Sequence, residues 1–523
     1  MQRSYYFYFY LFLFCIFFFI PFLGSYHLFD WDEINFAECA REMIVTGNFS
    51  TVQINFEAFW EKPPLFIWMQ VIAMKIFGIN EFAARFPNVI ASICTLFVLF
   101  FLGKKIVSQK MAIWWAILYA GSYLPNIYFH SGIIDPWFNL FIFSCIACFF
   151  IANQHKDSNP TLYYVFSGVF AGLAILTKGP VALLIIGASL AIWIVCNRFK
   201  NLPSMLHLLF WGGLLLLIGC SWFILLFFQG NINVVYDFII YQIRLFQTGD
   251  AGHSGPFYYH FIVLLIGCIP ASFLALKMLI KKQEKSSFIF LMQILFWFTL
   301  ILFTIVKTKI IHYSSLCYLP LTFMGAYYLT TIELSKFPKW ILSSISLLNI
   351  CISLLLISLT YILITGELSS YVSLNDPFAT ASLKADVSWN MIHFIPGVVL
   401  LIGAIVAFYY RVKNPLKALS FVIVSQLILI FSLKILFVSN VEQYSQGAAI
   451  EFYENNRGEG VVFTPLGLKS YAHLYYGNVM PLKGSIKKEY ALSKIQDKER
   501  FLKHYQKLKM IGEKNGFVFY EFE

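Results

Sequence analysis

Charged residues are scarce in this chain of 523 residues: Asp, Glu, Lys and Arg make up 12% of it, whereas 59% is hydrophobic. The mean hydropathy is +0.71, and a soluble protein has too little interior to hide that much apolar surface. The apolar–polar alternation of membrane β-barrels is also absent, because the apolar runs are continuous. These absences exclude a soluble globular protein and a barrel, and they predict a polytopic α-helical membrane protein.

The sequence also lacks a disulfide framework and a signal-peptide cleavage site. Most of its ten cysteines lie inside apolar runs, where a thiol packs as a small hydrophobic side chain. Cys145 and Cys148 form a CxxC pair within FIFSCIACFF, which favours helix packing over redox or metal chemistry. The N-terminal apolar run is longer than the roughly 7–15 residues of a signal-peptide core, and no A-x-A site follows it, so we predict a retained first span.

What the chain has in abundance is apolar runs near the length of a membrane span. About 20 helical residues, at a rise of about 1.5 Å each, cross a hydrocarbon core of roughly 30 Å. About thirteen spans are predicted, at about residues 5–23, 88–103, 111–129, 137–152, 162–176, 181–196, 206–228, 257–280, 287–306, 316–331, 340–364, 391–410 and 418–438.

The distribution of charge predicts the orientation of these spans. The short loops on one side are rich in Lys and Arg with almost no Asp or Glu, and the segments on the other side carry most of the acids. This bias places the N-terminus in the cytoplasm, and it explains the net charge of +11 better than a nucleic-acid partner does.

Two domains are expected. Residues 1–438 form the all-α transmembrane domain, with a first outer loop at about residues 24–88, and residues 439–523 form a small domain on the outer side. The tail has two apolar runs, GVVFT and GFVFYEF, around the helical-looking stretch KIQDKERFLKHYQKLKM, which predicts an α/β fold.

The first outer loop concentrates the charge that the rest of the chain lacks. Residues 34–45 have helix character with a stop at Gly47, and residues 65–77 predict an amphipathic helix suited to lie flat in the membrane interface. Asp32 and Glu33 stand where a helix starts, so helix-start charges are an alternative to a catalytic role. For Glu61 and Lys62, the alternative is a solvated turn. The ionisable residues of this loop are Asp30, Asp32, Glu33, Glu38, Arg41, Glu42, Glu61, Lys62 and Arg85.

Other outer turns carry matching chemistry. Asp135 lies in an apolar context, where a carboxylate is costly unless it is used or paired. The outer turns bring carboxylates, imidazoles and cations to one side of the membrane. In a reaction in which a lipid phosphate leaves, cations hold the phosphate, a carboxylate activates the nucleophile and a metal neutralises charge, so these residues suit such a reaction. A lone histidine such as His253 is more often a hydrogen-bonding loop residue than a metal ligand. The further outer residues are Lys178, Asp237, Arg244, Asp250, His253, His260, Lys307, Lys309 and His312.

Six segments in order resemble the ArnT-like and protein-mannosyltransferase-like integral membrane glycosyltransferases (the GT-C fold, family 39). They are WDEINFAECAREMIVTGNF, FEAFWEKPPLFIWMQVIAMKIFGINEFAARFP, HSGIIDP, LTKGPVALL, GHSGPFYYH and KTKIIHYSSLCYLPL, and they cover about the first 330 residues. The chain departs from the family pattern at Trp31, where relatives often have proline, and at Asn35-Phe36, where an arginine–tyrosine pair is common.

The resemblance implies a glycosyltransferase on the outer face of the bacterial inner membrane. Its partners would be a polyprenyl-phosphate-linked sugar donor, an envelope acceptor (a lipid A-like lipid, a glycan or a protein) and membrane lipids. Transfer would invert the anomeric centre by direct displacement. A divalent metal, with zinc as the expected ion, and no organic cofactor are implied.

With the resemblance and the residues taken together, we predict three groups of site residues. The catalytic carboxylates are Asp32, Glu33 and Asp135, and the metal ligands are Glu61 and His253. The residues that bind the lipid phosphate and the sugar are Lys62, Lys178, Arg244, Lys307, Lys309 and His312.

Two other classes of protein stay open at this stage. A transporter or flippase of a lipid-linked or anionic substrate would place charges and broken helices near the bilayer midplane, often with internal repeats. Here the charges lie in outer loops and no repeat is clear. A structural subunit of an envelope assembly fits the density of paired acids and cations less well.

Overall fold

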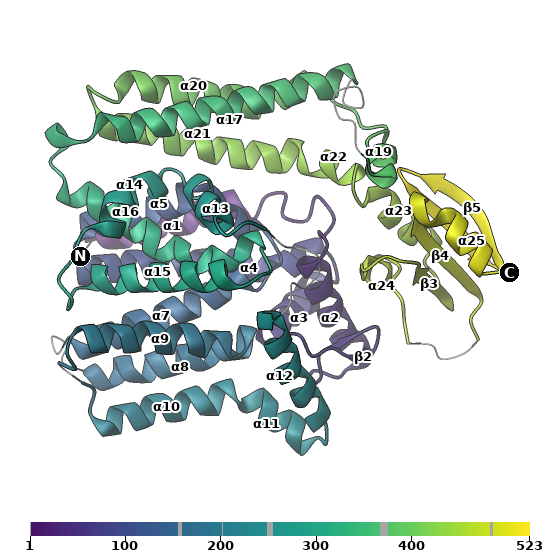
Figure 1. Cartoon of the computed structure of the whole chain (residues 1–523), viewed down its shortest axis with the longest axis horizontal. Helices are drawn as coiled ribbons and strands as arrows, with labels where there is room; N and C mark the ends of the chain where they lie inside the picture. Colours follow the sequence, from purple (N-terminus) through teal and green to yellow (C-terminus); the bar gives the residue numbers. More distant parts are fainter. Residues whose placement is uncertain (1, 155–158, 201, 248–254, 367–374, 482–484) are drawn as a thin grey trace.

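The computed structural model describes residues 2–154, 159–200, 202–247, 255–366, 375–481 and 485–523. A body of long helices carries a domain with a β-sheet at one end, and the C-terminus lies on that domain (Figure 1). The body helices are α1 (Gln2–Phe19), α4 (Glu81–Ile106), α5 (Gln109–Gly121), α6 (Tyr123–Ile127), α7 (Asp135–Asn153), α8 (Pro160–Lys178), α9 (Val181–Cys196), α10 (Met205–Gly219), α11 (Ser221–Phe228), α12 (Ile232–Gln247), α13 (Tyr259–Gly267), α14 (Ala271–Ile280), α15 (Phe288–Ile305), α16 (Tyr318–Thr331), α17 (Lys339–Thr365), α20 (Ile395–Tyr410) and α21 (Pro415–Leu436). Four 3-10 helices join them: η1 (Tyr128–His130), η3 (Ile311–Cys317), η4 (Leu334–Lys336) and η5 (Met391–Phe394).

The predicted apolar runs are helical, but several are broken. Seven helices of the described part are long and apolar enough to cross a membrane, or eight if α10 and α11, bent by 49°, form one span. Residues 257–280 divide into α13 and α14 at Pro270, because proline lacks the N–H that continues a helix. The chain is therefore a polytopic helical protein, and the number of thirteen crossings stays a prediction.

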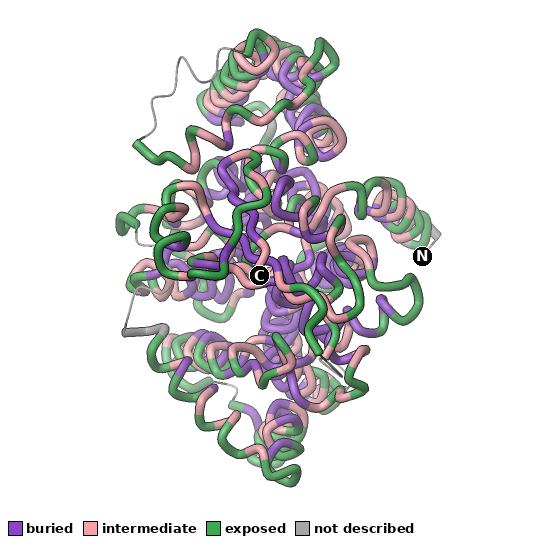
Figure 2. Tube along the Cα trace, turned by 90° about the vertical axis from the view of Figure 1, so that its right-hand side faces the viewer, coloured by how far each residue is buried: buried purple, intermediate pink, exposed green. Residues whose placement is uncertain are grey.

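Helices in the body pack closely where side chains are small. A Cβ atom added at Gly168 of α8 would lie 2.7 Å from the carbonyl oxygen of Trp211 in α10, and one at Gly172 would lie 2.7 Å from Ile218. Glycines one turn apart thus let two backbones approach, as in membrane helix pairs that have no hydrophobic driving force between them. In the view turned by 90° from Figure 1, buried residues gather in the middle of the molecule and exposed ones lie around it (Figure 2).

The first outer loop folds at the end of the body that faces the sheet domain (Figure 1). It contains α2 (Asp32–Thr46), the two-stranded antiparallel pair β1 (Gln53–Ile54) and β2 (Glu57–Ala58), and α3 (Leu65–Phe77). The helix α2 ends where the sequence predicts, because Gly47 adopts a left-handed φ of 71° and its N–H donates to the carbonyl of Met43. Helix α3 matches the predicted residues 65–77.

The C-terminal residues form one four-stranded sheet with short helices. The strand order is β3-β4-β6-β5, with β3 parallel to β4 and the other neighbours antiparallel. The two apolar runs of the tail become β3 and β6, and the basic stretch between them becomes η6, α25 and part of β5. The elements are α19 (Pro377–Ser382), α22 (Val438–Gln443), α23 (Gly447–Asn456), β3 (Val461–Pro465), α24 (Ala472–Tyr476), β4 (Lys488–Lys494), η6 (Ile495–Asp497), α25 (Lys498–His504), β5 (Leu508–Lys514) and β6 (Phe517–Phe522).

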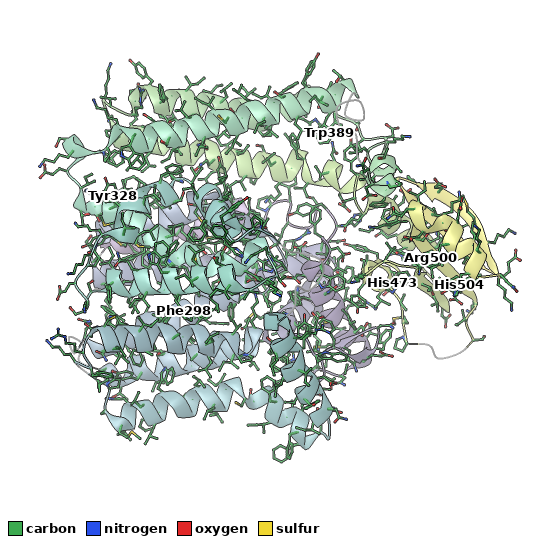
Figure 3. All side chains as sticks on the ribbon, viewed as in Figure 1. Phe298, Tyr328, Trp389, His473, Arg500 and His504 are labelled. Atoms are coloured by element: carbon green, nitrogen blue, oxygen red, sulfur yellow. The ribbon has the colours of Figure 1, made fainter. Side chains whose placement is uncertain are left out.

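The sheet domain is docked on the first outer loop. One apolar cluster contains buried residues of both, and α24 packs against α2. The N–H of Leu28 donates to the hydroxyl of Tyr476 at 2.6 Å, and Arg41 Nη2 donates to the carbonyl of Val479 at 2.8 Å. Figure 3 shows His473 of α24 on the side of the domain that faces the loop. The C-terminal domain thus packs against the loop that carries the predicted site.

Candidate active site

A buried arginine organises the loop around the predicted catalytic carboxylates. Arg85 of α4 donates from Nε and Nη2 to the two carboxylate oxygens of Glu33, at 3.1 and 3.0 Å. Its remaining donors contact the carbonyls of Leu23, Tyr26 and His27 at 2.8–3.0 Å. A fork of five N–H groups suits this junction, because it fixes a carboxylate and a turn of backbone at once.

Glu33 is fully engaged by these and two further contacts. Its carboxylate accepts from the N–H of Phe29 at 2.9 Å and from the N–H of Gly132. The side chain is buried. This geometry favours a positioning role for Glu33 in place of the predicted catalytic role, because the carboxylate holds the loop and the 131–134 turn against α4.

Asp32 precedes Glu33 in the chain but points elsewhere. It is the first residue of α2, its side chain is 30% exposed, and its Oδ2 lies 3.3 Å from Nε2 of His312 in η3. The ring of His312 makes T-shaped contacts with the rings of Tyr128 and Tyr313. A partly exposed carboxylate beside an oriented imidazole is available to a substrate hydroxyl, as a general base must be.

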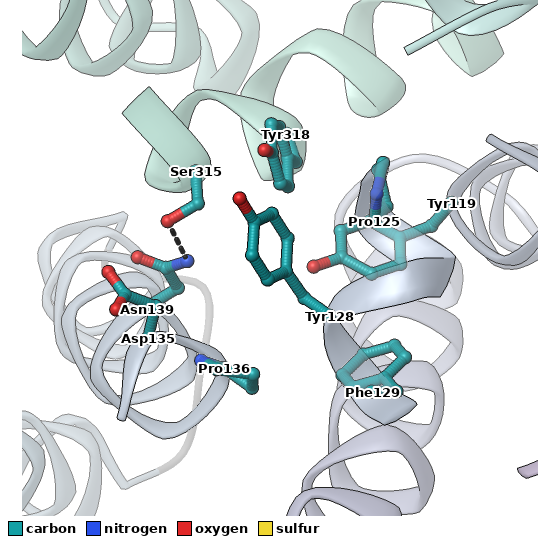
Figure 4. Close-up of a pocket in the computed structure, with 9 residues that line it drawn as sticks. All are labelled: Tyr119, Pro125, Tyr128, Phe129, Asp135, Pro136, Asn139, Ser315 and Tyr318. Carbon is teal, nitrogen blue, oxygen red and sulfur yellow. Dashed lines mark hydrogen bonds between the residues drawn. The ribbon is translucent and has the colours of Figure 1, made fainter. Parts of the chain in front are cut away.

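Asp135 forms a second, buried ion pair. It is the first residue of α7, its side chain is 3% exposed, and its Oδ1 accepts from Lys178 Nζ at 2.7 Å. Within the described residues its other oxygen, Oδ2, accepts no hydrogen bond. Beside it a small cavity is lined by tyrosines, and Asn139 Nδ2 donates to Ser315 Oγ at 2.9 Å (Figure 4). The buried carboxylate of Asp135 is thus paired with the ammonium group of Lys178, as a charge in an apolar environment requires.

The two carboxylates belong to one electrostatic cluster. Lys178, His312 and Lys62 all lie near enough to Asp135 for their charges to act on its carboxylate. Since His312 contacts Asp32, residues from α2, α7, α8, η3 and the segment before α3 meet at one end of the body. The sequence placed these residues on one side of the membrane, and the structure brings them together.

A tyrosine joins two of the predicted phosphate ligands. Lys62 Nζ lies 5.5 Å and Arg244 Cζ lies 5.2 Å from the centre of the Tyr241 ring. Tyr241 and Arg244 are one turn apart on α12, which lies beside the loop in Figure 1. Each of the two cations is thus held near the face of one aromatic ring.

Lys309 and Lys307, both predicted to bind the lipid phosphate or the sugar, lie in different environments. Lys309 donates from Nζ to the carbonyls of Phe303, Thr304 and Val306 at 2.6–3.0 Å, so its three donors cap the end of α15. The prediction of a substrate contact for Lys309 does not fit this geometry. Lys307 is exposed in the segment between α15 and η3.

The predicted metal site is described only in part. His253 lies outside the described residues, and Glu61 is half-buried, with its carbonyl accepting from Gln242 Nε2 at 3.4 Å. Over the ranges that the structure describes, no three His, Cys, Asp or Glu side chains are grouped to hold an ion. The described residues therefore do not make up the site, and we derive no chemical step through a metal.

The other acids of α2 are structural. Arg41 donates from Nε and Nη2 to Glu38 at 2.7 and 2.6 Å, and both side chains are buried. Glu42 accepts from the N–H of Phe56 at 2.7 Å. Burial, and then the neighbouring charge of Glu38, raise the pKa of Glu42 to about 8. Glu42 is thus protonated at neutral pH.

Sequence reasoning missed the residues that orient the charged ones. The sequence identifies Arg85 as one of several charges in the loop but not as the partner of Glu33, and Tyr241 is not among the predicted site residues. The ring of Tyr313 was also missed: it lies 5.5 Å from Lys178 Nζ. One signal was available for Tyr241, because it stands three residues before Arg244 in a helical segment and so shares its face. The pairing of Arg85 with Glu33 spans 52 residues and carries no local signal.

Known proteins resemble this chain in sequence and in fold. A model of the family described as dolichyl-phosphate-mannose-protein mannosyltransferase matches residues 61–224. The undecaprenyl phosphate-alpha-4-amino-4-deoxy-L-arabinose arabinosyl transferase of Shewanella sediminis is 27% identical over 311 residues, which cover 58% of this chain and 56% of the relative. Arabinosyl transferase 1 of Proteus mirabilis is 27% identical over 394 residues, covering 72% and 68%. The chain thus spans little more than half the length of the first of these curated relatives.

Solved structures share the fold over nearly the whole chain. ArnT from Cupriavidus metallidurans, bound to undecaprenyl phosphate, superposes with a TM-score of 0.80 at 17% identity, covering 98% of this chain and 97% of that one. The oligosaccharyltransferase AglB from Archaeoglobus fulgidus gives 0.53 at 10% identity, covering 95% and 70%. The family model and the relatives thus show what this chain resembles, and the solved structures show that it shares the GT-C fold of ArnT.

Proposed function

We propose that this protein transfers a sugar from an undecaprenyl-phosphate-linked donor to an envelope acceptor. The observation that carries the proposal is the cluster in which the partly exposed Asp32 contacts His312 beside the buried Asp135–Lys178 pair. The names of the relatives support the donor class, since those proteins are arabinosyl transferases that use undecaprenyl phosphate sugars. ArnT bound to undecaprenyl phosphate supports the lipid carrier.

Asp32 acts on the acceptor in this proposal. An acceptor hydroxyl attacks the anomeric carbon, its oxygen forms the new C–O bond, and its proton passes to the Asp32 carboxylate. The bond from the anomeric carbon to the phosphate oxygen breaks, and its electron pair leaves with the lipid phosphate. Attack opposite to the leaving group inverts the anomeric centre. His312 orients Asp32 from 3.3 Å.

Cations stabilise the leaving phosphate. Lys62 and Arg244, held on the ring of Tyr241, are the proposed contacts for the lipid phosphate, since Arg and Lys recognise phosphate oxygens by charge-assisted hydrogen bonds. Lys178, paired with Asp135, adds positive charge to the same cluster. Zinc at Glu61 and His253 would supply further charge neutralisation, and it stays a prediction from the family resemblance.

We propose the outer face of the bacterial inner membrane as the place of reaction. In this arrangement thirteen spans start from a cytoplasmic N-terminus and leave the C-terminal domain in the periplasm. The Lys/Arg-rich short loops support this orientation. The docking of the C-terminal domain on the first outer loop supports a common side for both.

Reconstitution tests the proposal and separates it from transport. Purified protein in vesicles, with a radiolabelled undecaprenyl-phosphate sugar and a membrane extract, transfers label to an acceptor if the proposal is correct. Asp32→Asn abolishes transfer at an unchanged protein level. Label that changes leaflet without changing carrier contradicts transfer and identifies a flippase.

A further inference from the structure

The C-terminal domain places an aromatic ring against the residue next to Asp32. The ring of Tyr471, in the segment that leads into α24, lies 5.7 Å from the ring of Trp31 with an interplanar angle of 46°. Trp31 is 40% exposed although it contacts this second ring. A partly exposed aromatic pair therefore lies beside Asp32 in the chain, with one member from each domain.

The Trp31 ring is held by Asn35, and the backbone beside Tyr471 is held by a local hydrogen bond. With its amide oriented to satisfy both groups, Asn35 accepts from Nε1 of Trp31 at 3.0 Å and donates to the Trp31 carbonyl at 3.1 Å. On the other side, the hydroxyl of Ser470, next to Tyr471 in the chain, accepts from the N–H of Ala472 at 3.1 Å. Rings held in one orientation lose little conformational freedom when a ligand binds, so they are suited to recognition.

The surroundings of the pair are aromatic and acidic. Trp60, next to Glu61, is 41% exposed, and Glu57 and Glu61 lie near enough to Tyr471 for their charges to act on its hydroxyl. Asp32 follows Trp31 directly in the chain. The cations of the proposed phosphate site, in contrast, surround Tyr241 on α12.

This combination matches the chemistry of a saccharide. A pyranose ring has apolar C–H faces that pack on aromatic rings, and hydroxyl groups that donate to carboxylates. We propose that Trp31 and Tyr471 form a binding surface for a saccharide part of the acceptor, with Tyr471 as a specificity-determining residue contributed by the C-terminal domain. The assignment to the acceptor rests on the proposed function.

Saccharide binding to the full-length protein in nanodiscs tests this surface. Saturation-transfer NMR with methyl glucoside, methyl mannoside and methyl N-acetylglucosaminide gives a Kd for each, and undecaprenyl phosphate binding is measured on the same samples. Tyr471→Ala and Trp31→Ala are expected to weaken glycoside binding at least about tenfold, or ~1.4 kcal/mol. Tyr471→Phe, which keeps the ring, stays within about twofold of the wild type.

The controls separate this inference from the proposed function. Tyr409→Ala, at a 60% exposed tyrosine of α20, leaves all affinities unchanged, and undecaprenyl phosphate binds every variant equally. If no methyl glycoside binds the wild type, if Trp31→Ala and Tyr471→Ala bind as the wild type does, or if a Ser/Thr peptide binds there instead, the saccharide surface is wrong. Displacement of the glycoside by an undecaprenyl-phosphate sugar overturns the acceptor assignment. Failure of the wild type to bind undecaprenyl phosphate contradicts the proposed function alone.

Discussion

Two neighbouring carboxylates, Asp32 and Glu33, should respond in opposite ways to the same change. In Glu33→Gln, the amide NH₂ group faces donors, because Arg85 and two backbone N–H groups all donate to the native carboxylate. The substitution also leaves a buried guanidinium without its counter-charge. Removing one member of a buried ion pair costs about 3–5 kcal/mol.

Asp32→Asn should cost far less stability. Its side chain is 30% exposed and has one contact with His312 at 3.3 Å, and an ion pair near solvent contributes about 0–1 kcal/mol. Loss of the base, however, removes the acceptor of the substrate proton. We therefore expect Asp32→Asn to fold like the wild type and to lose sugar transfer.

Thermal unfolding in detergent, followed by tryptophan fluorescence, and transfer of radiolabelled sugar measure the two effects separately. Glu33→Gln is expected to lower the unfolding midpoint clearly, and Asp32→Asn to leave it within about 1 kcal/mol of the wild type. If Glu33→Gln unfolds with the wild type but transfers nothing, its carboxylate takes part in the chemistry and the positioning role is wrong. Full transfer by Asp32→Asn would remove Asp32 as the base.

Three further variants test other contacts. Lys309→Met is expected to lower the unfolding midpoint with no change in undecaprenyl phosphate affinity, because its donors cap α15; a weakened affinity would return Lys309 to the substrate site. Lys62→Ala and Arg244→Ala should each raise the Kd for undecaprenyl phosphate about tenfold or more, since a hydrogen bond to a charged group contributes about 1.5–3 kcal/mol. If both variants bind undecaprenyl phosphate as tightly as the wild type does, the phosphate site is wrong. Glu42 has a pKa raised from 4.5 to about 8, so the folded state binds the extra proton and loses stability as the pH rises from about 4.5 to 8. Glu42→Gln should flatten that decline in an unfolding series from pH 5 to 9, and an unchanged slope would show that the carboxyl is not protonated.

Much of the architecture follows from local pattern. The run of residues 65–77 predicts α3, and Gly47 predicts the end of α2, because helix periodicity and a left-handed stop are properties of a few consecutive residues. The gathering of Asp32, Lys62 and Asp135 at one end was also predictable, since alternating spans and loop charge assign each turn to a side of the membrane.

Roles within the site were less predictable. Asp32 and Glu33 are adjacent acids at a helix start, and the sequence gives them the same properties. Only the approach of Arg85, 52 residues away, turns one of them into a structural anchor and leaves the other near solvent. Likewise Lys307 and Lys309 differ by two positions, yet the second caps a helix and the first is exposed.

The sequence by itself determined that this protein is a helical membrane protein with acidic and basic site residues on one side. Hydrophobic runs and loop charges can be read from consecutive residues, without knowledge of contacts between distant segments. The tertiary structure alone decided which charges are paired, which carboxylate stays open, and that Tyr471 of the C-terminal domain contacts Trp31. Those outcomes depend on distances between segments far apart in the chain. Coulomb energies and hydrogen bonds vary steeply over a few ångströms, and no local pattern fixes such distances.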